Sequence, residues 1–224
     1  MIRICVSGSR GKMGSRIIAL AREDRDIEVA GAFDIDGDPE QSIGKCDCLI
    51  DFTAPKATVE HCAICERHKK AMVIGTTGLS EADTARIRQA SRVIPLVLSP
   101  NMSIGVNLLF KLVRDAARTL GAPYRVSIRE AHHVHKKDAP SGTAKELARV
   151  IRETRDDRDI PIQSIREDEI VGDHTVFFES PYDTLQLVHS AKTRDIFALG
   201  ALTAAKYISR KKAGLYSMKD VLGL

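Results

Sequence analysis

The chain has 224 residues, 43% hydrophobic and 29% charged, a balance typical of a globular protein with one large or two small domains. Its formal net charge is +4, and Lys and Arg are scattered among acidic residues, so we expect no nucleic-acid partner. No apolar run has the length of a membrane span, and the strand-like residues 2–6 begin without a signal-peptide pattern. We therefore expect a cytoplasmic protein with no membrane partner.

The five cysteines are an odd number in a chain without an export signal, which argues against a disulfide framework. The two close pairs, with two histidines nearby, offer ligand types that bind zinc. One pair leads into an apolar strand, however, and the other lies mid-helix, so buried free thiols are favoured and we expect no metal. The residues concerned are Cys5, Cys46, Cys48, Cys62, Cys65, His61 and His68.

A glycine-rich turn follows the first predicted strand, residues 2–7, and precedes a helical pattern that includes Ile17 and Leu20. Strand, glycine turn and helix in this order are the context of a dinucleotide-binding turn, in which backbone N–H groups approach a pyrophosphate. The spacing is GxxGxxG, which is less specific than GxGxxG, and glycines that only form a tight turn are the alternative. The predicted cofactor-binding residues here are Gly8, Gly11, Lys12, Met13 and Gly14.

Asp34 ends the second predicted strand, 20 residues after Gly14. A carboxylate in this position accepts hydrogen bonds from the ribose hydroxyls of the adenosine and repels a 2′-phosphate. Because Ile35 follows where an arginine would help NADPH, NADH is favoured over NADPH as the cofactor. Arg10 and Lys12 are close enough in the turn to weaken that preference.

Short apolar strands alternate with helices through the next part of the chain: strands at 48–52, 71–74 and 94–98, and helices at 56–68 and after Ser80. This alternation predicts a doubly wound, Rossmann-like parallel sheet, whose ligands bind beyond the carboxyl ends of the strands. The loops there supply the remaining candidate cofactor contacts, although each can also be a simple connector. The residues concerned are Phe52 at the end of its strand and, in the loops, Thr53, Gly75, Thr76, Thr77, Ser99, Asn101 and Met102.

The pattern changes after residue 103. A long helix at 107–120 precedes an alternating strand at 124–130, and a helix from about Ser141 to Val150 fades into a polar run at 152–159. Strand-like runs at 162–166, 174–179 and 184–189 have no helices between them, which predicts an open mixed or antiparallel sheet in a second α+β domain. A final helix is expected at 194–210. The predicted domains are 1–103 with 194–224, and 104–193.

The stretch EAHHVHKKDAPSGTA, residues 130–144, combines two chemical devices. A cationic cluster supplies a proton donor and positive charges for an anionic substrate, and the entry to the following helix offers free backbone N–H groups to a carboxylate or phosphate. A solvated turn followed by an N-cap is the alternative. The cluster consists of His132, His133, His135, Lys136 and Lys137, and the helix entry of Ser141, Gly142 and Thr143.

This stretch closely resembles the signature of the dihydrodipicolinate reductase family. DFTAP at 51–55, GTTG at 75–78, SPNMSIGVN at 99–107 and GLYSMKDVL at 214–222 are similar to segments of that family in the same order. One departure is the short segment 35–45, where the family has a longer excursion. It is near the minimum for a parallel crossover, so we expect a helix to be missing there, which affects the adenosine side of the cofactor site.

The resemblance implies a homotetrameric enzyme of lysine and diaminopimelate biosynthesis that transfers hydride from a nicotinamide to C4 of a small cyclic dicarboxylate. It further implies His132 as general acid, Lys136 as the group that holds or polarises the substrate, and His133 with Ser141, Gly142 and Thr143 as carboxylate ligands. Arg194 and Phe197 would contact the cofactor, and His135 and Lys137 would only orient groups or face solvent. Two alternatives stay open: an amino-acid dehydrogenase on a similar frame, and a dinucleotide-sensing protein without turnover.

Overall fold

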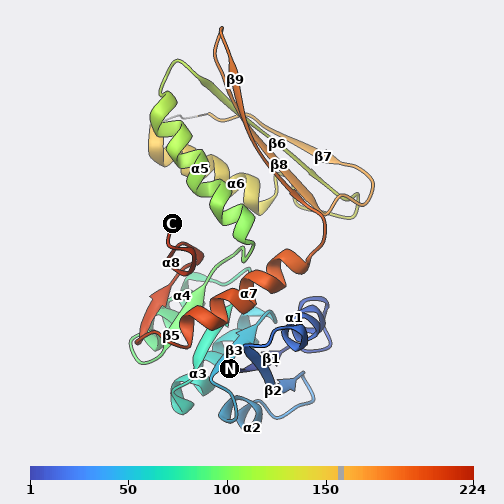
Figure 1. Cartoon of the computed structure of the whole chain (residues 1–224), viewed down its shortest axis with the longest axis vertical. Helices are drawn as coiled ribbons and strands as arrows, with labels where there is room; N and C mark the ends of the chain where they lie inside the picture. The colour runs from blue at the N-terminus through green and yellow to red at the C-terminus, as the bar shows by residue number, and fades with distance from the viewer. Residues whose placement is uncertain (156–158) are drawn as a thin grey trace. The chain divides into compact units, whose positions relative to one another are not determined.

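The computed structural model describes residues 1–155 and 159–224. The chain forms two compact units, which are considered separately (Figure 1). Unit 1 comprises Met1–Ile104 and Asp195–Leu224, and unit 2 comprises Gly105–Arg194. Part of the predicted polar run, residues 156–158, lies outside the described residues.

Unit 1 is built on a six-stranded parallel sheet with the strand order β10-β5-β4-β3-β1-β2. This confirms the predicted doubly wound sheet. Because β2 lies on one side of β1 and β3 on the other, the strand order reverses beside β1, and ligands of such sheets bind at the carboxyl ends of the strands next to that reversal. The strands are β1 (Ile2–Ser7), β2 (Ile27–Phe33), β3 (Cys48–Asp51), β4 (Ala71–Ile74), β5 (Pro95–Leu98) and β10 (Gly214–Tyr216).

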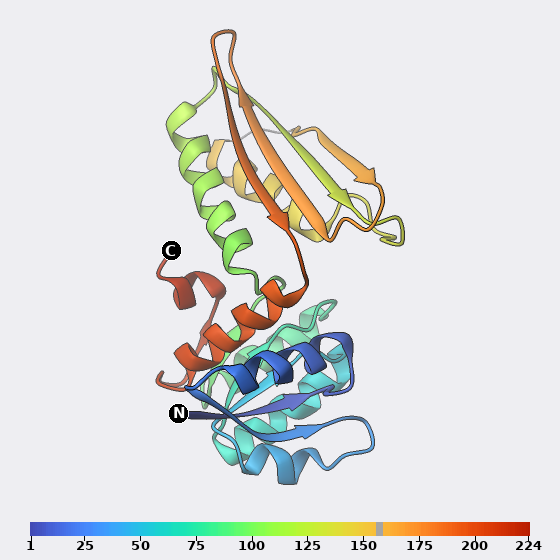
Figure 2. The same ribbon diagram turned by 45° about the vertical axis from the view of Figure 1, so that its right-hand side comes forward.

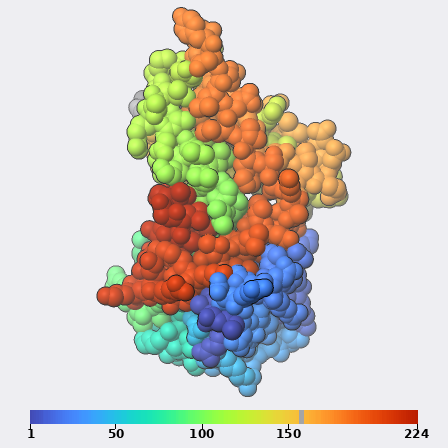
Figure 3. Space-filling model, viewed as in Figure 1, coloured from blue at the N-terminus to red at the C-terminus, as the bar shows by residue number. Residues whose placement is uncertain are grey.

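Helices cover both faces of this sheet, and the side chains of each strand alternate between two cores. Ile4 and Val6 pack in a core with α1 and α7, whereas Cys5 packs in a second core with α2, α3 and α4. In Figure 3, α7 lies against the blue N-terminal part of unit 1. The helices are α1 (Lys12–Glu23), α2 (Pro39–Gly44), α3 (Pro55–His68), α4 (Glu81–Ala90), α7 (Asp195–Ile208) and α8 (Met218–Leu222).

The predicted absence of a helix in the short crossover after β2 is wrong. Helix α2 occupies it, although with six residues it is shorter than two turns. Asp38 accepts a hydrogen bond from the Gln41 N–H at 3.0 Å, and Pro39 takes the first helical position, so two local start signals suffice.

All five cysteines are buried and free. Burial raises the pKa of the Cys62 thiol to about 11, and it raises the pKa of Cys48 and Cys65 as well. These thiols therefore stay protonated at neutral pH and pack as small apolar groups, as the sequence pattern favoured.

Unit 2 is a four-stranded mixed sheet with the order β7-β6-β8-β9, in which only the β6–β7 pair is parallel. Helices α5 (Ile104–Leu120) and α6 (Gly142–Arg155) cover one face, and their apolar sides enclose a core with Ile128, Val176 and Phe178 (Figure 2). Strand β6 runs two residues beyond its predicted end because its last residues pair with β7. The strands are β6 (Arg125–His132), β7 (Ile162–Arg166), β8 (Gly172–Glu179) and β9 (Thr184–Ala191).

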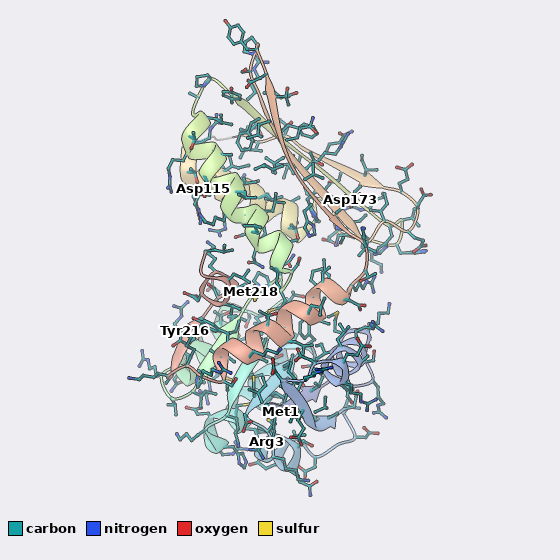
Figure 4. All side chains as sticks on the ribbon, viewed as in Figure 1. Met1, Arg3, Asp115, Asp173, Tyr216 and Met218 are labelled. Carbon is teal, nitrogen blue, oxygen red and sulfur yellow. The ribbon has the colours of Figure 1, made fainter. Side chains whose placement is uncertain are left out.

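The C-terminal segment completes the sheet of unit 1. Strand β10 pairs with β5, and Met218 at the start of α8 is buried in the core that also contains Ile4 (Figure 4). Among the described residues, no helix combines the length and apolar character needed to cross a membrane.

Candidate functional site

The glycine turn of unit 1 connects β1 to α1. Gly8 has φ +67°, a conformation that side chains disfavour, and the Gly11 N–H donates to its carbonyl at 2.9 Å. A Cβ on Gly14 would lie 2.1 Å from the same carbonyl oxygen, so only glycine permits this approach. No side chain caps the start of α1, which leaves its first N–H groups available to a phosphate.

Asp34 follows the carboxyl end of β2, beside this turn. Its carboxylate accepts hydrogen bonds from the backbone N–H of Arg10 and from that of Ile35, both at 3.0 Å. These bonds, that of Arg10 first, hold the pKa of Asp34 below its usual range. The guanidinium of Arg10 lies 3.6 Å from Asp34 and 2.6 Å from Asp36. An acid and a base therefore lie side by side where the adenosine ribose is expected.

The loops after β3 and β4 are held together by the buried carboxylate of Asp51. One oxygen accepts hydrogen bonds from the hydroxyls of Thr53, Thr58 and Thr76 at 2.7 to 3.0 Å. The other lies 2.6 Å from His61 Nδ1. Thr76 is consequently buried and serves this network.

The remaining predicted cofactor residues of unit 1 differ in exposure. Lys12 and Thr77 are exposed, whereas Met13, Phe52 and Asn101 are half-buried. Ser99 and Met102 are buried, and the Ser99 hydroxyl donates to the Asn101 carbonyl at 2.8 Å. Gly75 lies under the Phe52 ring, where a Cβ would come within 2.3 Å of ring carbons. Phe197 is half-buried in the first turn of α7, and Arg194 is exposed at the end of unit 2.

In unit 2, the strand register brings four polar side chains to one end of the helix-covered face of the sheet. His132 pairs with Arg166 of β7, and Glu130 pairs with His174 of β8. Because side chains alternate along β6, Glu130 and His132 continue the buried row begun by Val126 and Ile128. The row therefore changes from apolar to ionisable at the carboxyl end of β6.

Glu130, Arg166 and His174 are the residues of this group that the sequence did not predict, and Glu130 is the one for which a local signal existed. Its carboxylate is fully buried and bonds to His132 Nδ1, to the Arg166 guanidinium at 2.9 Å and to the Ser141 N–H at 3.3 Å. Burial raises the pKa of Glu130. The hydrogen bonds from Arg166 and His132 have a larger, opposite effect, so the pKa lies below its usual range. The available signal was a charged residue at a core position of an alternating strand.

His132 is surrounded by ionisable groups. Burial is the main cause that lowers its pKa below the usual range, Glu130 opposes this effect, and the positive charges of Lys136 and Arg166 reinforce it. Burial also lowers the pKa of His174 to about 3, so the His174 imidazole is uncharged near pH 7. The His174 ring lies edge-on to His132, with centroids 5.2 Å apart.

The loop after β6 presents the other predicted cations. The ammonium group of Lys136 lies 2.8 Å from Asp138, and the side chain is 23% exposed. His135 and Lys137 are exposed, and the His133 ring lies 6.2 Å from that of His135. Lys136 is thus the loop lysine whose charge acts on His132.

The entry to α6 differs residue by residue. Ser141 is buried: its hydroxyl accepts from the Ala144 N–H at 3.2 Å and lies 3.1 Å from His174 Nε2. Gly142 is exposed and Thr143 half-buried. The buried Ser141 side chain therefore caps the N-terminus of α6, while the backbone of Gly142 is open to solvent.

Glu130, His132 and His174 also have the mutual spacing of metal ligands, with potential ligand atoms within 4.8 Å of one another. The Arg166 guanidinium, however, already bonds to the same carboxylate. The positive charge of Arg166 repels a metal ion at this position, so these side chains suit a protonated imidazole better than a metal ion.

The doubly wound sheet with its glycine turn, together with the ionisable group of unit 2, defines an oxidoreductase with a dinucleotide-binding domain and a separate α+β unit. The family models for the dihydrodipicolinate reductase N-terminus and C-terminus match residues 2–102 and 105–222. The chain belongs to the dihydrodipicolinate reductase family, whose N-terminal domain binds a nicotinamide dinucleotide.

Curated relatives support this membership over the full chain. The 4-hydroxy-tetrahydrodipicolinate reductase of Syntrophus aciditrophicus is 39% identical over 265 residues, covering 100% of this chain and 99% of the relative. That of Geobacter metallireducens is 38% identical over 266 residues, covering 100% of both. Because this chain has 224 residues, these alignments include positions that it lacks.

Among solved structures, a dipicolinate-bound dihydrodipicolinate reductase from Paenisporosarcina sp. TG-14 matches with a TM-score of 0.85 at 26% identity, covering 97% of each chain. An aspartate dehydrogenase from Thermotoga maritima matches with a TM-score of 0.54 at 11% identity, covering 95% of this chain and 98% of that one. The second likeness shows only that the fold is shared.

Proposed function

We propose that this chain reduces 4-hydroxy-tetrahydrodipicolinate to tetrahydrodipicolinate with NADH or NADPH, in diaminopimelate and lysine biosynthesis. The observation that carries the proposal is the pairing of His132 with buried Glu130 at the end of β6, within the electrostatic influence of Lys136. Full-length relatives that bear this activity in their names support it.

The residues of unit 1 fit a nicotinamide dinucleotide. The turn needs glycine at Gly8 for its positive φ and at Gly14 for lack of room for a Cβ, and it presents the uncapped start of α1, which suits a pyrophosphate. Asp34 would accept the ribose hydroxyls, and the loops braced by Asp51 would line the rest of the site. When bound, the dinucleotide supplies the hydride.

NADH is the favoured cofactor because the Asp34 carboxylate is ionised and would repel a 2′-phosphate. The guanidinium of Arg10, 3.6 Å from that carboxylate, would partly offset the repulsion. NADPH is therefore a weaker but usable cofactor in this proposal.

The substrate is a small cyclic dicarboxylate, a class supported by the dipicolinate in the Paenisporosarcina structure. Lys136 and His133 would bind its carboxylates, together with the backbone of Gly142 and Thr143 at the start of α6. Ser141 would contribute by capping that helix, because its hydroxyl is buried.

His132 is the proposed general acid. Addition of hydride at C4 leaves negative charge on the neighbouring ring carbon, and the His132 imidazolium would give its proton to that carbon. Lys136 would stabilise the developing charge through its ammonium group. The 4-hydroxyl group must first leave as water, which gives the unsaturated ring that accepts the hydride. The hydride and the proton are then the two hydrogens that this ring gains.

A homotetramer is proposed as the assembly. The face of the sheet in unit 2 opposite α5 and α6 carries Phe177 and Val188, and Val188 is 59% exposed. Apolar residues on a sheet face of this kind are typical of an interface. Sedimentation equilibrium tests this: a monomer at micromolar concentration contradicts it.

The function is tested by following NADH absorbance while the preceding synthase of the pathway generates fresh substrate. We expect oxidation of NADH only when the synthase is active, and a loss of at least about a hundredfold in kcat for His132→Gln or Lys136→Ala. The exposed His135→Gln is the matched control and should retain activity. Oxidation of NADH with the substrates of an amino-acid dehydrogenase would favour that alternative, and dinucleotide binding without turnover would favour a sensing protein. Normal turnover in both the His132 and the Lys136 variant refutes the assignment.

A further inference from the structure

Glu130 is a carboxylate at a position where the buried row of its strand is otherwise apolar. It occupies a core position in the row of Val126 and Ile128, where a buried charge is costly to desolvate. Replacing a buried ion pair by apolar residues is often neutral or stabilising. A carboxylate at this position therefore points to a chemical task.

The geometry around Glu130 indicates that task. One carboxylate oxygen bonds to His132 Nδ1, and the other accepts from Arg166 at 2.9 Å and from the Ser141 N–H at 3.3 Å. The Arg166 guanidinium is itself anchored to the carbonyls of Ile165 and Asp138, at 2.6 and 2.5 Å. The carboxylate is thus held by Arg166 of β7 and by Ser141 at the entry to α6, and it holds the imidazole in turn.

The opposite ring nitrogen of His132 lies beside Gly172 of β8. A Cβ at position 172 would come within 3.0 Å of Nε2 and 3.3 Å of Cδ2. The absence of a side chain there keeps Nε2 clear, while Glu130 occupies Nδ1. The two contacts together distinguish the ring nitrogens, leaving Nε2 as the one able to reach another molecule.

We propose that Glu130, braced by Arg166, is a positioning residue that keeps a proton on His132 Nδ1 and so makes Nε2 the proton donor. The inference rests on the proposed function. In the step it describes, the Nε2–H bond breaks and its proton bonds to the substrate carbon, while the Nδ1 proton stays against the carboxylate. The product form of His132 is the neutral Nδ1–H tautomer.

The charged groups facing His132 determine how protonation responds to Glu130. Lys136 from the loop after β6 and Arg166 from β7 disfavour the imidazolium, and His174 from β8 is neutral. Glu130 is the carboxylate that opposes them. Removing its charge should therefore shift the basic limb of the pH–rate profile to lower pH.

The first test needs no substitution. In the imidazole nitrogen NMR spectrum of the intact protein at pH 8, His132 should appear as the Nδ1–H tautomer. An Nε2–H tautomer overturns the inference. Assignment uses the signal that disappears in His132→Gln.

The second test uses Glu130→Gln, with Glu146→Gln as the matched control, because Glu146 is a half-buried glutamate of α6 that pairs with Arg149. We expect kcat to fall at least about a hundredfold, because neutralising the carboxylate that orients the histidine of a serine protease costs about 10⁴-fold in kcat. The basic limb should move to lower pH, and Glu130→Asp, which keeps the charge, should recover part of the activity. Glu146→Gln should match the wild type.

A structural role alone predicts a different outcome. Should Glu130→Gln fail to fold, the double variant Glu130→Leu with Arg166→Met removes both buried charges, and we expect it to fold but turn over at least about a hundredfold more slowly. A folded double variant with normal kcat refutes the inference. If His132→Gln is inactive while Glu130→Gln has normal kcat and pH profile, the proposed function stands and the inference fails; normal turnover in His132→Gln removes the proposed function instead.

Discussion

Asp51 and His61 form a buried pair in unit 1, with Asp51 Oδ2 2.6 Å from His61 Nδ1. The Asp51 carboxylate is fully buried at the carboxyl end of β3, and His61 lies in the middle of α3, the helix that follows β3. The other carboxylate oxygen gathers Thr53 and Thr76 from two loops. One buried carboxylate therefore fixes the shape of the loops proposed to line the cofactor site.

Replacing Asp51 by Asn should lower the free energy of unfolding by about 3 kcal/mol, because it removes the buried carboxylate that binds His61 and three threonine hydroxyls. Urea denaturation measures this difference. The matched control is Asp115→Asn, which breaks an exposed pair with Lys111 and should cost less than about 1 kcal/mol. Equal effects of the two substitutions would contradict the importance of the buried network.

The same pair predicts a pH dependence. Burial raises the pKa of Asp51, but hydrogen bonds from His61 and Thr53 outweigh it, so the pKa in the folded protein is below the usual value. A carboxyl group with a depressed pKa in the folded protein stabilises the fold at pH values above its unfolded-state pKa of about 3.9. This stabilisation is lost as the pH falls through the folded-state pKa. The stability advantage of the wild type over Asp51→Asn should thus be constant near neutrality and shrink below about pH 4.

Asp34→Ala tests the cofactor preference. Loss of the carboxylate removes a hydrogen-bond acceptor for NADH and a repulsive charge for NADPH, while Arg10 remains. We expect the NADH dissociation constant to rise about tenfold, and that for NADPH to rise less or to fall. Fluorescence titration of both cofactors gives the ratio, with Asp36→Ala as the neighbouring control. An unchanged ratio removes Asp34 from the cofactor site.

Periodicity predicted the parallel sheet of unit 1 well, because strands buried on both faces are apolar runs that local sequence reveals. It predicted α2 poorly, because six residues carry too little pattern, and only Asp38 and Pro39 signal its start. The mixed order β7-β6-β8-β9 depends on long-range pairing, which no local spacing specifies.

The candidate site was predictable where the residues are adjacent in sequence and unpredictable where pairing assembles them. His132 and Lys136 stand in one short stretch, whereas Arg166 and His174 reach Glu130 and His132 only through the register of β7 and β8. Ser141 was predicted at the helix entry, but its inward-facing hydroxyl follows from the contact with His174. Tertiary contacts supplied what the motif could not.

The pH dependence of turnover follows from the environment of His132. A general acid must be protonated, so kcat/KM should fall as pH rises through the pKa of His132 in the free enzyme, which burial and Lys136 place below about 6.5. A bound dicarboxylate favours the imidazolium, so the corresponding fall in kcat should lie at higher pH. Steady-state kinetics from pH 5 to 9 test both expectations. If the residual activity of His132→Gln still falls at the same pH, a group other than His132 causes the fall.

Gly172→Ala separates the position of His132 from its charge. The new Cβ would lie 3.0 Å from Nε2, so the imidazole must shift by a few tenths of an ångström, while Glu130 and Arg166 stay in place. Small displacements of a catalytic group are costly, and we expect kcat to fall about tenfold with little change in the midpoint of urea denaturation. The control is Gly44→Ala at the end of α2, whose Cβ would make only an ordinary 3.8 Å contact with His68. Unchanged kcat in Gly172→Ala would show that the space beside Nε2 is not used in proton transfer.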